Sequence, residues 1–197
     1  MTGLVNADSA RDQLLTLLAE RSAKRGDFVL ASGRRSELYV DCRLTTMSPE
    51  GQRLVGELGL AELRAAGWDA DAVGGLTLGA DPIAYAIAHA SAFAHERGDG
   101  PMVRAFTVRK QAKEHGTGRR IEGPFAAGDR VVVVEDVITT GGSALTAVEA
   151  IREAGGVVLG VLAVVDREEG GSEAIEAAGL TVRRMALASE LVARLAV

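Results

Sequence analysis

"VVVVEDVITTGGSA", residues 131–144, is the segment with the clearest structural pattern in the chain. Four valines run into two carboxylates, Glu135 and Asp136, and a segment rich in threonine, glycine and serine follows. An apolar run without polar alternation is typical of a strand that is covered on both faces. The glycines end this strand and lead into a helix expected over residues 143–154, with Ser143 as a candidate N-cap. The segment therefore predicts a strand, a polar turn and a helix, in that order.

Strand-like and helix-like patterns alternate along the rest of the chain. Helices are expected at residues 9–25, 48–67 and from 81 onward, and strands within 28–43 and at 102–108, 130–135 and 157–165. Such alternation predicts an α/β fold with a mostly parallel central sheet flanked by helices. Three polar segments, 74–81, 135–143 and 166–169, then fall at the C-terminal ends of strands, where sheets of this kind bind their ligands.

The overall composition is that of an ordinary globular protein. The 197 residues are 47% hydrophobic and 25% charged, which predicts one domain over 1–197. A net charge of −5 argues against broad nucleic-acid binding. The single Cys42 excludes an internal disulfide and a cysteine metal cluster. No apolar run approaches the roughly 18 residues that span a bilayer, and the N-terminal segment does not read as a signal peptide. We therefore expect a cytoplasmic protein without nucleic-acid or membrane partners.

The polar turn has the composition of a phosphate site. It consists of Thr139, Thr140, Gly141, Gly142 and Ser143. The glycines allow close approach of the backbone, the hydroxyls add donors, and the start of a helix favours an anion. Taken alone, Ser143 is more simply an N-cap, and the two carboxylates are more simply a solvated loop. Carboxylates beside a phosphate need a cation or hydroxyls to bind. A ribose 5-phosphate meets both demands, whereas P-loop and dinucleotide fingerprints are absent from this segment.

This segment resembles the signature of type I phosphoribosyltransferases, which bind 5-phosphoribosyl 1-diphosphate (PRPP). The shared pattern is a hydrophobic strand, two acids and a turn rich in threonine and glycine. The resemblance implies a phosphoribosyltransferase fold. It also implies PRPP contacts from Glu135, Asp136, Val137, Ile138, Thr139, Thr140, Gly141, Gly142 and Ser143.

Three further segments resemble the orotate phosphoribosyltransferase family. They are "FVLASGRRSELYVD" (28–41), similar to its N-terminal substrate loop, "VRKQAKEHGTGRRIEG" (108–123), similar to its mobile catalytic loop, and "VVDREEGG" (164–171), similar to a late strand end. Together with the signature they cover most of the chain from 28 to 170. The resemblance implies an N-terminal hood at about 1–45, a core at about 68–170 and a mobile catalytic loop at about 109–120.

The basic loop is expected to bind the leaving group. The resemblance assigns Arg109, Lys110, Lys113 and His115 to PRPP, where cations stabilise the departing diphosphate. Lys113, His115 and Asp136 are the expected catalytic residues. The glycines that flank the loop suit a lid. Taken alone, a charged run of this kind is more often a solvated surface, although this chain is acidic overall.

The base is expected on the other side of the site. The resemblance places Arg167, Thr139 and Tyr39 at the orotate, with the guanidinium in a bidentate contact with the carboxylate. Without the resemblance, Arg167 pairs more simply with Asp166 or Glu168, and Tyr39 is more simply a core residue. The chain also departs from the family. Ala31 and Gly79 stand where many members carry lysine.

The resemblance implies transfer of the 5-phosphoribosyl group of PRPP to orotate, which gives orotidine 5-monophosphate and diphosphate in pyrimidine (UMP) biosynthesis. It implies Mg²⁺ carried by PRPP rather than by a metal site of the protein, and a homodimer whose catalytic loop reaches the neighbouring subunit. Two alternatives stay open: another type I phosphoribosyltransferase, for a purine or a different pyrimidine, and a non-catalytic PRPP-sensing regulator. The regulator is disfavoured because no basic face or helix-turn-helix domain is evident.

Overall fold

The computed structural model describes residues 7–29, 35–111 and 120–195. Its main sheet has six strands in the order β5-β4-β3-β6-β7-β8. Neighbouring strands are parallel except for β4 and β5, which are antiparallel. The strands are β3 (Ala72–Leu76), β4 (Arg104–Val108), β5 (Ile121–Glu122), β6 (Arg130–Ile138), β7 (Val157–Asp166) and β8 (Thr181–Leu187). The expected α/β fold with a mostly parallel sheet is confirmed.

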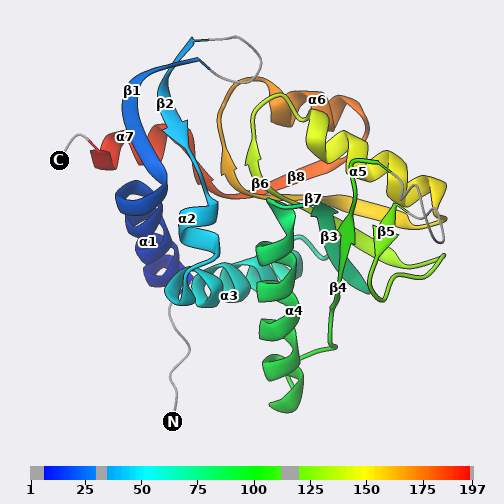
Figure 1. The fold of residues 1–197 in the computed structure, drawn as a ribbon. Coiled ribbons are helices and arrows are strands. Elements are labelled where there is room, and N and C mark those ends of the chain that lie inside the picture. Colours follow the sequence, from blue (N-terminus) through cyan, green and yellow to red (C-terminus); the bar gives the residue numbers. More distant parts are fainter. Residues whose placement is uncertain (1–6, 30–34, 112–119, 196–197) are drawn as a thin grey trace.

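Helices cover both faces of the sheet, as Figure 1 shows. They are α3 (Pro49–Ala65) and α4 (Ala80–Glu96) on one face, and α5 (Gly142–Glu153) and α6 (Gly171–Ala177) on the other. Val132 and Val134 belong to the hydrophobic cluster with α3 and α4, whereas Val131 and Val133 belong to the cluster with α5. Successive side chains of a strand point to opposite faces, so a strand with two covered faces needs apolar residues without alternation.

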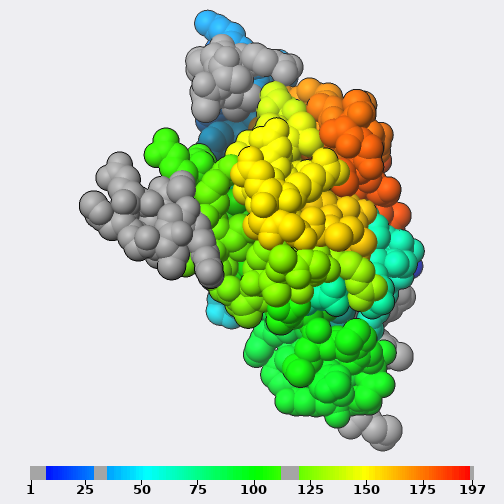
Figure 2. Space-filling model, turned by 90° about the vertical axis from the view of Figure 1, so that its right-hand side faces the viewer, coloured from blue at the N-terminus to red at the C-terminus, as the bar shows by residue number. Residues whose placement is uncertain are grey.

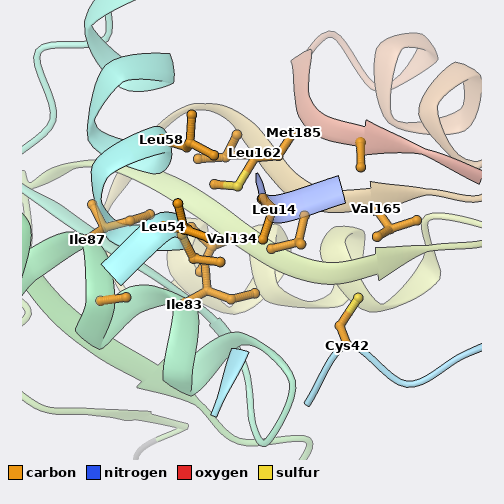
Figure 3. Packing of buried hydrophobic residues seen from close by; sticks show 14 of the residues in the cluster. Leu14, Cys42, Leu54, Leu58, Ile83, Ile87, Val134, Leu162, Val165 and Met185 are labelled. Carbon is orange, nitrogen blue, oxygen red and sulfur yellow. The ribbon is translucent and has the colours of Figure 1, made fainter. Parts of the chain in front are cut away.

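The larger cluster anchors the strand that carries the acid pair. In Figure 3, Leu54 and Leu58 of α3 and Ile83 and Ile87 of α4 pack around Val134. Val134 is fully buried and immediately precedes Glu135. Burial of a side chain of this size stabilises the fold by about 1.5–3 kcal/mol. The acid pair therefore follows a well-packed part of the strand.

The N-terminal part forms a separate two-stranded sheet. It follows α1 (Ala7–Leu17) and a π-helical segment (Leu18–Ser22), and consists of β1 (Ala23–Val29) and β2 (Arg35–Val40). The helix expected over 9–25 is too long: helical structure ends at Ser22. Ala23 and Arg25 pair with Val40 and Leu38 in an antiparallel ladder. Pairing with β2 overrides the local helix propensity here. The final helix, α7 (Ala188–Leu195), contacts β1.

The start of α3 follows the sequence prediction closely. The hydroxyl of Ser48 accepts a hydrogen bond from Gly51 N at 3.2 Å, and Pro49 occupies the first helical turn. A short helix, α2 (Arg43–Thr46), connects β2 to this point. Among the described residues, no helix is long and apolar enough to cross a membrane.

Candidate active site

The C-terminal ends of β3, β6 and β7 border a cavity of about 670 Å³. Its lining comes from the end of β2 and the segment after it, the end of β3 and the loop after it, the segment after β4, the end of β6 with its turn, and the end of β7. The lining residues are Tyr39, Val40, Asp41, Arg43, Leu76, Thr77, Leu78, Gly79, Lys110, Glu135, Asp136, Val137, Thr139, Thr140, Ser143 and Arg167. A recess of about 60 Å³, lined by Glu135 and residues 137–144, shares part of this wall. The predicted ligand edge of the sheet is therefore hollow.

The acid pair lies inside the last part of β6 rather than after it. Glu135 is only 6% exposed, and its Oε2 is buried without a hydrogen-bond partner among the described residues. Burial is the main cause that raises the pKa of Glu135, and the negative charge of Asp136 adds to it. Asp136 is partly buried, and its Oδ1 accepts a hydrogen bond from Val137 N at 2.9 Å. An unpaired buried carboxylate oxygen in a cavity wall suits a ligand hydroxyl.

The turn after β6 starts a helix with free amides. Gly141 is the N-cap of α5, and its φ of 79° is in the left-handed region. The expectation of Ser143 as N-cap is wrong: the helix begins at Gly142, because glycine adopts this backbone conformation without steric cost. A Cβ at Gly141 would lie 2.7 Å from the backbone oxygen of Gly171. The first helical bond runs from Leu145 N to Gly141 O at 3.0 Å, which leaves the amides of residues 142–144 without intrahelical partners.

Arg167 lies across the cavity in a largely buried setting. Its Nη2 donates to the hydroxyl of Ser36 at 2.7 Å and to Oε1 of Glu169 at 2.8 Å. These partners replace the simpler pairing with Asp166 or Glu168. The side chain is 6% exposed, and Nε is buried without a partner among the residues described. Arg167 thus joins the N-terminal hairpin to the end of β7, and its buried Nε remains available as a donor.

Tyr39 is not a core residue. It is 41% exposed and lines the cavity. The ring of Phe28, from the neighbouring strand, packs against it with a centroid distance of 5.4 Å. A supported, exposed aromatic ring offers a flat surface to a ligand.

The loop after β3 approaches the acid pair closely. Thr77 donates to Oδ2 of Asp81 at 2.6 Å, and Thr107 donates to Oδ1 of the same carboxylate at 2.8 Å. The Thr77–Leu78 peptide bond is cis. A Cβ at Gly79 would lie 2.5 Å from Cγ of Asp136. The side-chain direction at position 79 is therefore filled by the carboxylate of Asp136.

The basic loop is described only in part. Lys110 lines the cavity. Arg109 is absent from that lining, and its Nε lies 3.1 Å from Oε1 of Glu122. Lys113 and His115 lie outside the described residues, as does Ala31. Ile138, Gly141 and Gly142 line the recess.

Two cavity residues, Asp41 and Arg43, carry no role in the sequence prediction. Nε and Nη2 of Arg43 donate to Oδ1 and Oδ2 of Asp41 at 2.8 and 2.9 Å. These hydrogen bonds from Arg43 lower the pKa of Asp41. The signal was present in "YVDCR", where opposite charges two residues apart follow a strand. Nothing in that spacing shows that the pair faces the acids of β6.

Comparisons with known proteins agree with this geometry. The phosphoribosyl transferase domain family matches residues 49–178. An orotate phosphoribosyltransferase of Corynebacterium glutamicum is 50% identical over 187 residues, which are 95% of this chain and 96% of that protein. One from Aquifex aeolicus is 49% identical, with 92% and 97% covered. The crystal structure of Mycobacterium tuberculosis orotate phosphoribosyltransferase in complex with PRPP has a TM-score of 0.73 at 42% identity, covering 92% of this chain and 91% of that one.

Proposed function

The chain belongs to the orotate phosphoribosyltransferase family, within the phosphoribosyl transferase domain family, and we propose that it joins orotate to PRPP. N1 of orotate attacks C1 of the ribose. The bond from C1 to the diphosphate oxygen breaks, its electron pair leaves with diphosphate, and the proton of N1 passes to the solvent. The products are orotidine 5-monophosphate and diphosphate, a step of UMP biosynthesis.

One observation carries the proposal: a single cavity brings together an acid pair, a helix start with free amides, an exposed aromatic ring and a buried arginine. The acid pair and the helix start come from one segment, whereas the aromatic ring and the arginine come from two other parts of the chain. The volume of about 670 Å³ lies in the usual range for small-molecule sites. A sugar phosphate and an acidic planar base together need this set of partners.

PRPP occupies the side of the cavity next to α5. Its 5-phosphate takes the turn formed by residues 139–143, where the free amides and the positive end of the helix dipole favour an anion. The ribose hydroxyls bond to the carboxylates of Glu135 and Asp136, and the unpaired Oε2 of Glu135 gains a donor. Positive charge develops at C1 as diphosphate departs, and the carboxylate of Asp136 favours it. The Mycobacterium tuberculosis relative was solved in complex with PRPP, which supports PRPP as the ligand of this chain.

Orotate occupies the side next to the N-terminal hairpin. Arg167 supplies donors to its carboxylate, including the Nε that has no partner among the described residues. The ring of Tyr39 lies beside the base, and Thr139 completes the contact. Holding the two reactants in one geometry supplies most of the rate, because the reaction needs little proton chemistry.

The basic loop covers the leaving group. Lys110, at the cavity wall, and Arg109 supply cations from the described part of the loop. Lys113 and His115 act as catalytic residues in this proposal and lie outside the described part. Cations around the departing diphosphate stabilise the charge that builds up on it.

Mg²⁺ accompanies PRPP. It prefers oxygen ligands and keeps several waters, and the carboxylates of Glu135 and Asp136 give this wall of the cavity a matching oxygen chemistry. Bound to PRPP, the ion would neutralise charge on the diphosphate, while the residues of the chain orient the ribose and the base.

The functional unit is a homodimer with the catalytic loop shared between subunits. Tyr85 and Phe93, on α4, are 54% and 48% exposed, and Leu78 is 62% exposed. Figure 2 shows the region of α4 projecting at the lower end of the molecule. Large apolar side chains on a projecting helix suit contact with a second copy. Leu78 also lines the cavity, so a partner that covers this face comes close to the active site.

A base panel tests the function. The purified chain is given PRPP, Mg²⁺ and, one at a time, orotate, uracil, adenine, guanine or hypoxanthine, and diphosphate release is followed. Release with orotate alone supports the proposal. Release with a different base favours another type I phosphoribosyltransferase. PRPP binding without release for any base favours a PRPP-sensing regulator.

A further inference from the structure

Arg43 is a cation in the cavity wall with no role in the function described so far. It lies at the start of α2 and lines the cavity together with Leu78, Gly79 and Lys110. The pKa of Arg43 is raised, mainly by its hydrogen bonds to Asp41 and also by the negative charge of Asp136. Its guanidinium is therefore within electrostatic range of Asp136.

Asp41 holds this guanidinium in a fixed orientation. The carboxylate accepts from Nε and Nη2 at 2.8 and 2.9 Å, and also from the backbone N of Arg43 at 3.2 Å. Nη1 has no hydrogen-bond partner within the described ranges, and the side chain stays 47% exposed. A planar fork held on one edge by a carboxylate offers its remaining hydrogens to a second anion.

The charge distribution of the cavity indicates which anion this is. Within the described part of the chain, its lining includes three cations: Arg43, Lys110 and Arg167. Arg167 is 6% exposed and bonded to Ser36 and Glu169 on the base side. Arg43 and Lys110 remain beside the loop after β3. That loop contributes no cation, because residue 79 is a glycine whose side-chain direction is filled by Asp136.

Diphosphate is the most highly charged part of the substrate pair, and the 5-phosphate already has the start of α5. Resting on the proposed function, we propose that Arg43 binds the diphosphate group of PRPP and that Asp41 is a positioning residue for its guanidinium. The guanidinium fork matches phosphate oxygens in a bidentate geometry. Arg43 and Lys110, which line the same cavity, therefore both hold the leaving group.

The test measures diphosphate binding by titration calorimetry on the full chain, with inorganic diphosphate and Mg²⁺. We expect the Kd to rise about tenfold in Arg43→Gln, since a charge-assisted hydrogen bond is lost. Arg53→Gln is the matched control: Arg53 is also 47% exposed and pairs with Glu57 at 2.9 Å. Its Kd should equal that of the parent chain. The Kd of Arg43→Lys should lie between those of the parent chain and Arg43→Gln, because lysine keeps the positive charge but lacks the planar guanidinium group.

Kinetics separate diphosphate binding from base binding. The KM for PRPP should rise in Arg43→Gln and, less strongly, in Asp41→Asn, with the KM for orotate unchanged; Asp41→Glu should recover part of the loss. If Arg43→Gln does not fold, as judged by its melting transition, Arg43→Lys carries the same comparison. An unchanged diphosphate Kd, or a rise in the KM for orotate instead, overturns the assignment.

Failure of the proposed function gives a different result. If the parent chain binds diphosphate but forms no product from orotate, the function is wrong. The diphosphate titration of Arg43→Gln and Arg53→Gln still decides the role of Arg43 in that case. Equal Kd values in the two variants would overturn the inference while leaving the function intact.

Discussion

Nη2 of Arg167 donates a hydrogen bond of 2.7 Å to the hydroxyl of Ser36, although the two residues are 131 positions apart in the chain. Ser36 lies on β2 of the N-terminal hairpin, and Arg167 follows β7 of the main sheet. The proposed orotate site therefore depends on two separately built parts of the molecule. The hairpin supplies an aromatic surface at Tyr39 and also orients the arginine.

Substitution at Arg167 should act on orotate alone. Arg167→Gln removes the charge-assisted contact, and we expect the KM for orotate to rise by about tenfold or more. Ser36→Ala should give a smaller rise, because the guanidinium keeps Glu169 as a partner. Steady-state kinetics with each substrate varied in turn provide the measurement. A rise in the KM for PRPP, with the KM for orotate unchanged, would contradict this assignment, because it would place Arg167 at PRPP.

The turn before α5 should be intolerant of a side chain. Gly141→Ala forces a non-glycine residue to a φ of 79° and places its Cβ 2.7 Å from Gly171 O. The first effect costs about 1–2 kcal/mol and the clash about 1–3 kcal/mol more. Gly128→Ala isolates the first effect, because its φ is 90° but no atom lies within 4 Å of the added Cβ. Urea unfolding should show the larger loss for Gly141→Ala; equal losses would exclude the clash.

The unfolding free energy of the ligand-free protein should depend on pH through the carboxyl group of Glu135. Burial, and then the charge of Asp136, raise the pKa of this carboxyl above 4.5, while Lys110 opposes the shift. The native state then holds a proton that the unfolded chain has released, so stability falls as pH rises from 4.5 toward the raised pKa. Glu135→Gln removes this dependence. Its unfolding free energy relative to the parent chain should increase with pH over that interval.

Urea unfolding at several pH values above the ordinary glutamate pKa measures this difference. Glu149→Gln, at an exposed position of α5, makes the same substitution outside the cavity and provides the control. A constant difference for Glu135→Gln would show that the native carboxyl is ionised. The comparison uses changes with pH, so any fixed cost of burying an amide cancels.

Disruption of the α4 face should separate the proposed dimer. Phe93→Glu places a charge among the exposed apolar residues of this helix, and we expect monomers by light scattering coupled to size exclusion. Val157→Glu changes a side chain of similar exposure, 52%, at the start of β7, and should leave the mass unchanged. A parent chain that is already monomeric, or a dimer that survives Phe93→Glu, would argue against this face.

Much of the fold could be predicted because local patterns and tertiary structure agree. The valines before Glu135 pack on both faces of the sheet, as the unbroken apolar run predicts. Ser48 and Pro49 start α3 as expected. The exception is the segment after Ser22. Its strand conformation comes from pairing with β2, and a pattern read along one helix face contains no information on that partner.

From its residue pattern alone, the candidate site could be predicted only where its residues are contiguous; the family resemblance added Tyr39, Lys110 and Arg167, which also line the cavity. The acid pair and the turn after it are adjacent in sequence, so the pattern itself brings them together. The pairing of Arg167 with Ser36, and the presence of Arg43 in the same cavity as the acids, follow from how the hairpin lies over the main sheet. The N-cap at Gly141 was missed because it depends on a backbone angle rather than on a side-chain donor.

The most direct test of the central claim is to quantify both products from orotate, PRPP and Mg²⁺ in one reaction. Orotidine 5-monophosphate and diphosphate should appear in equal amounts with the parent chain, and both should fall severely in Asp136→Asn, which loses the carboxylate at the ribose. Diphosphate without orotidine 5-monophosphate, or near-normal product formation in Asp136→Asn, would contradict the account.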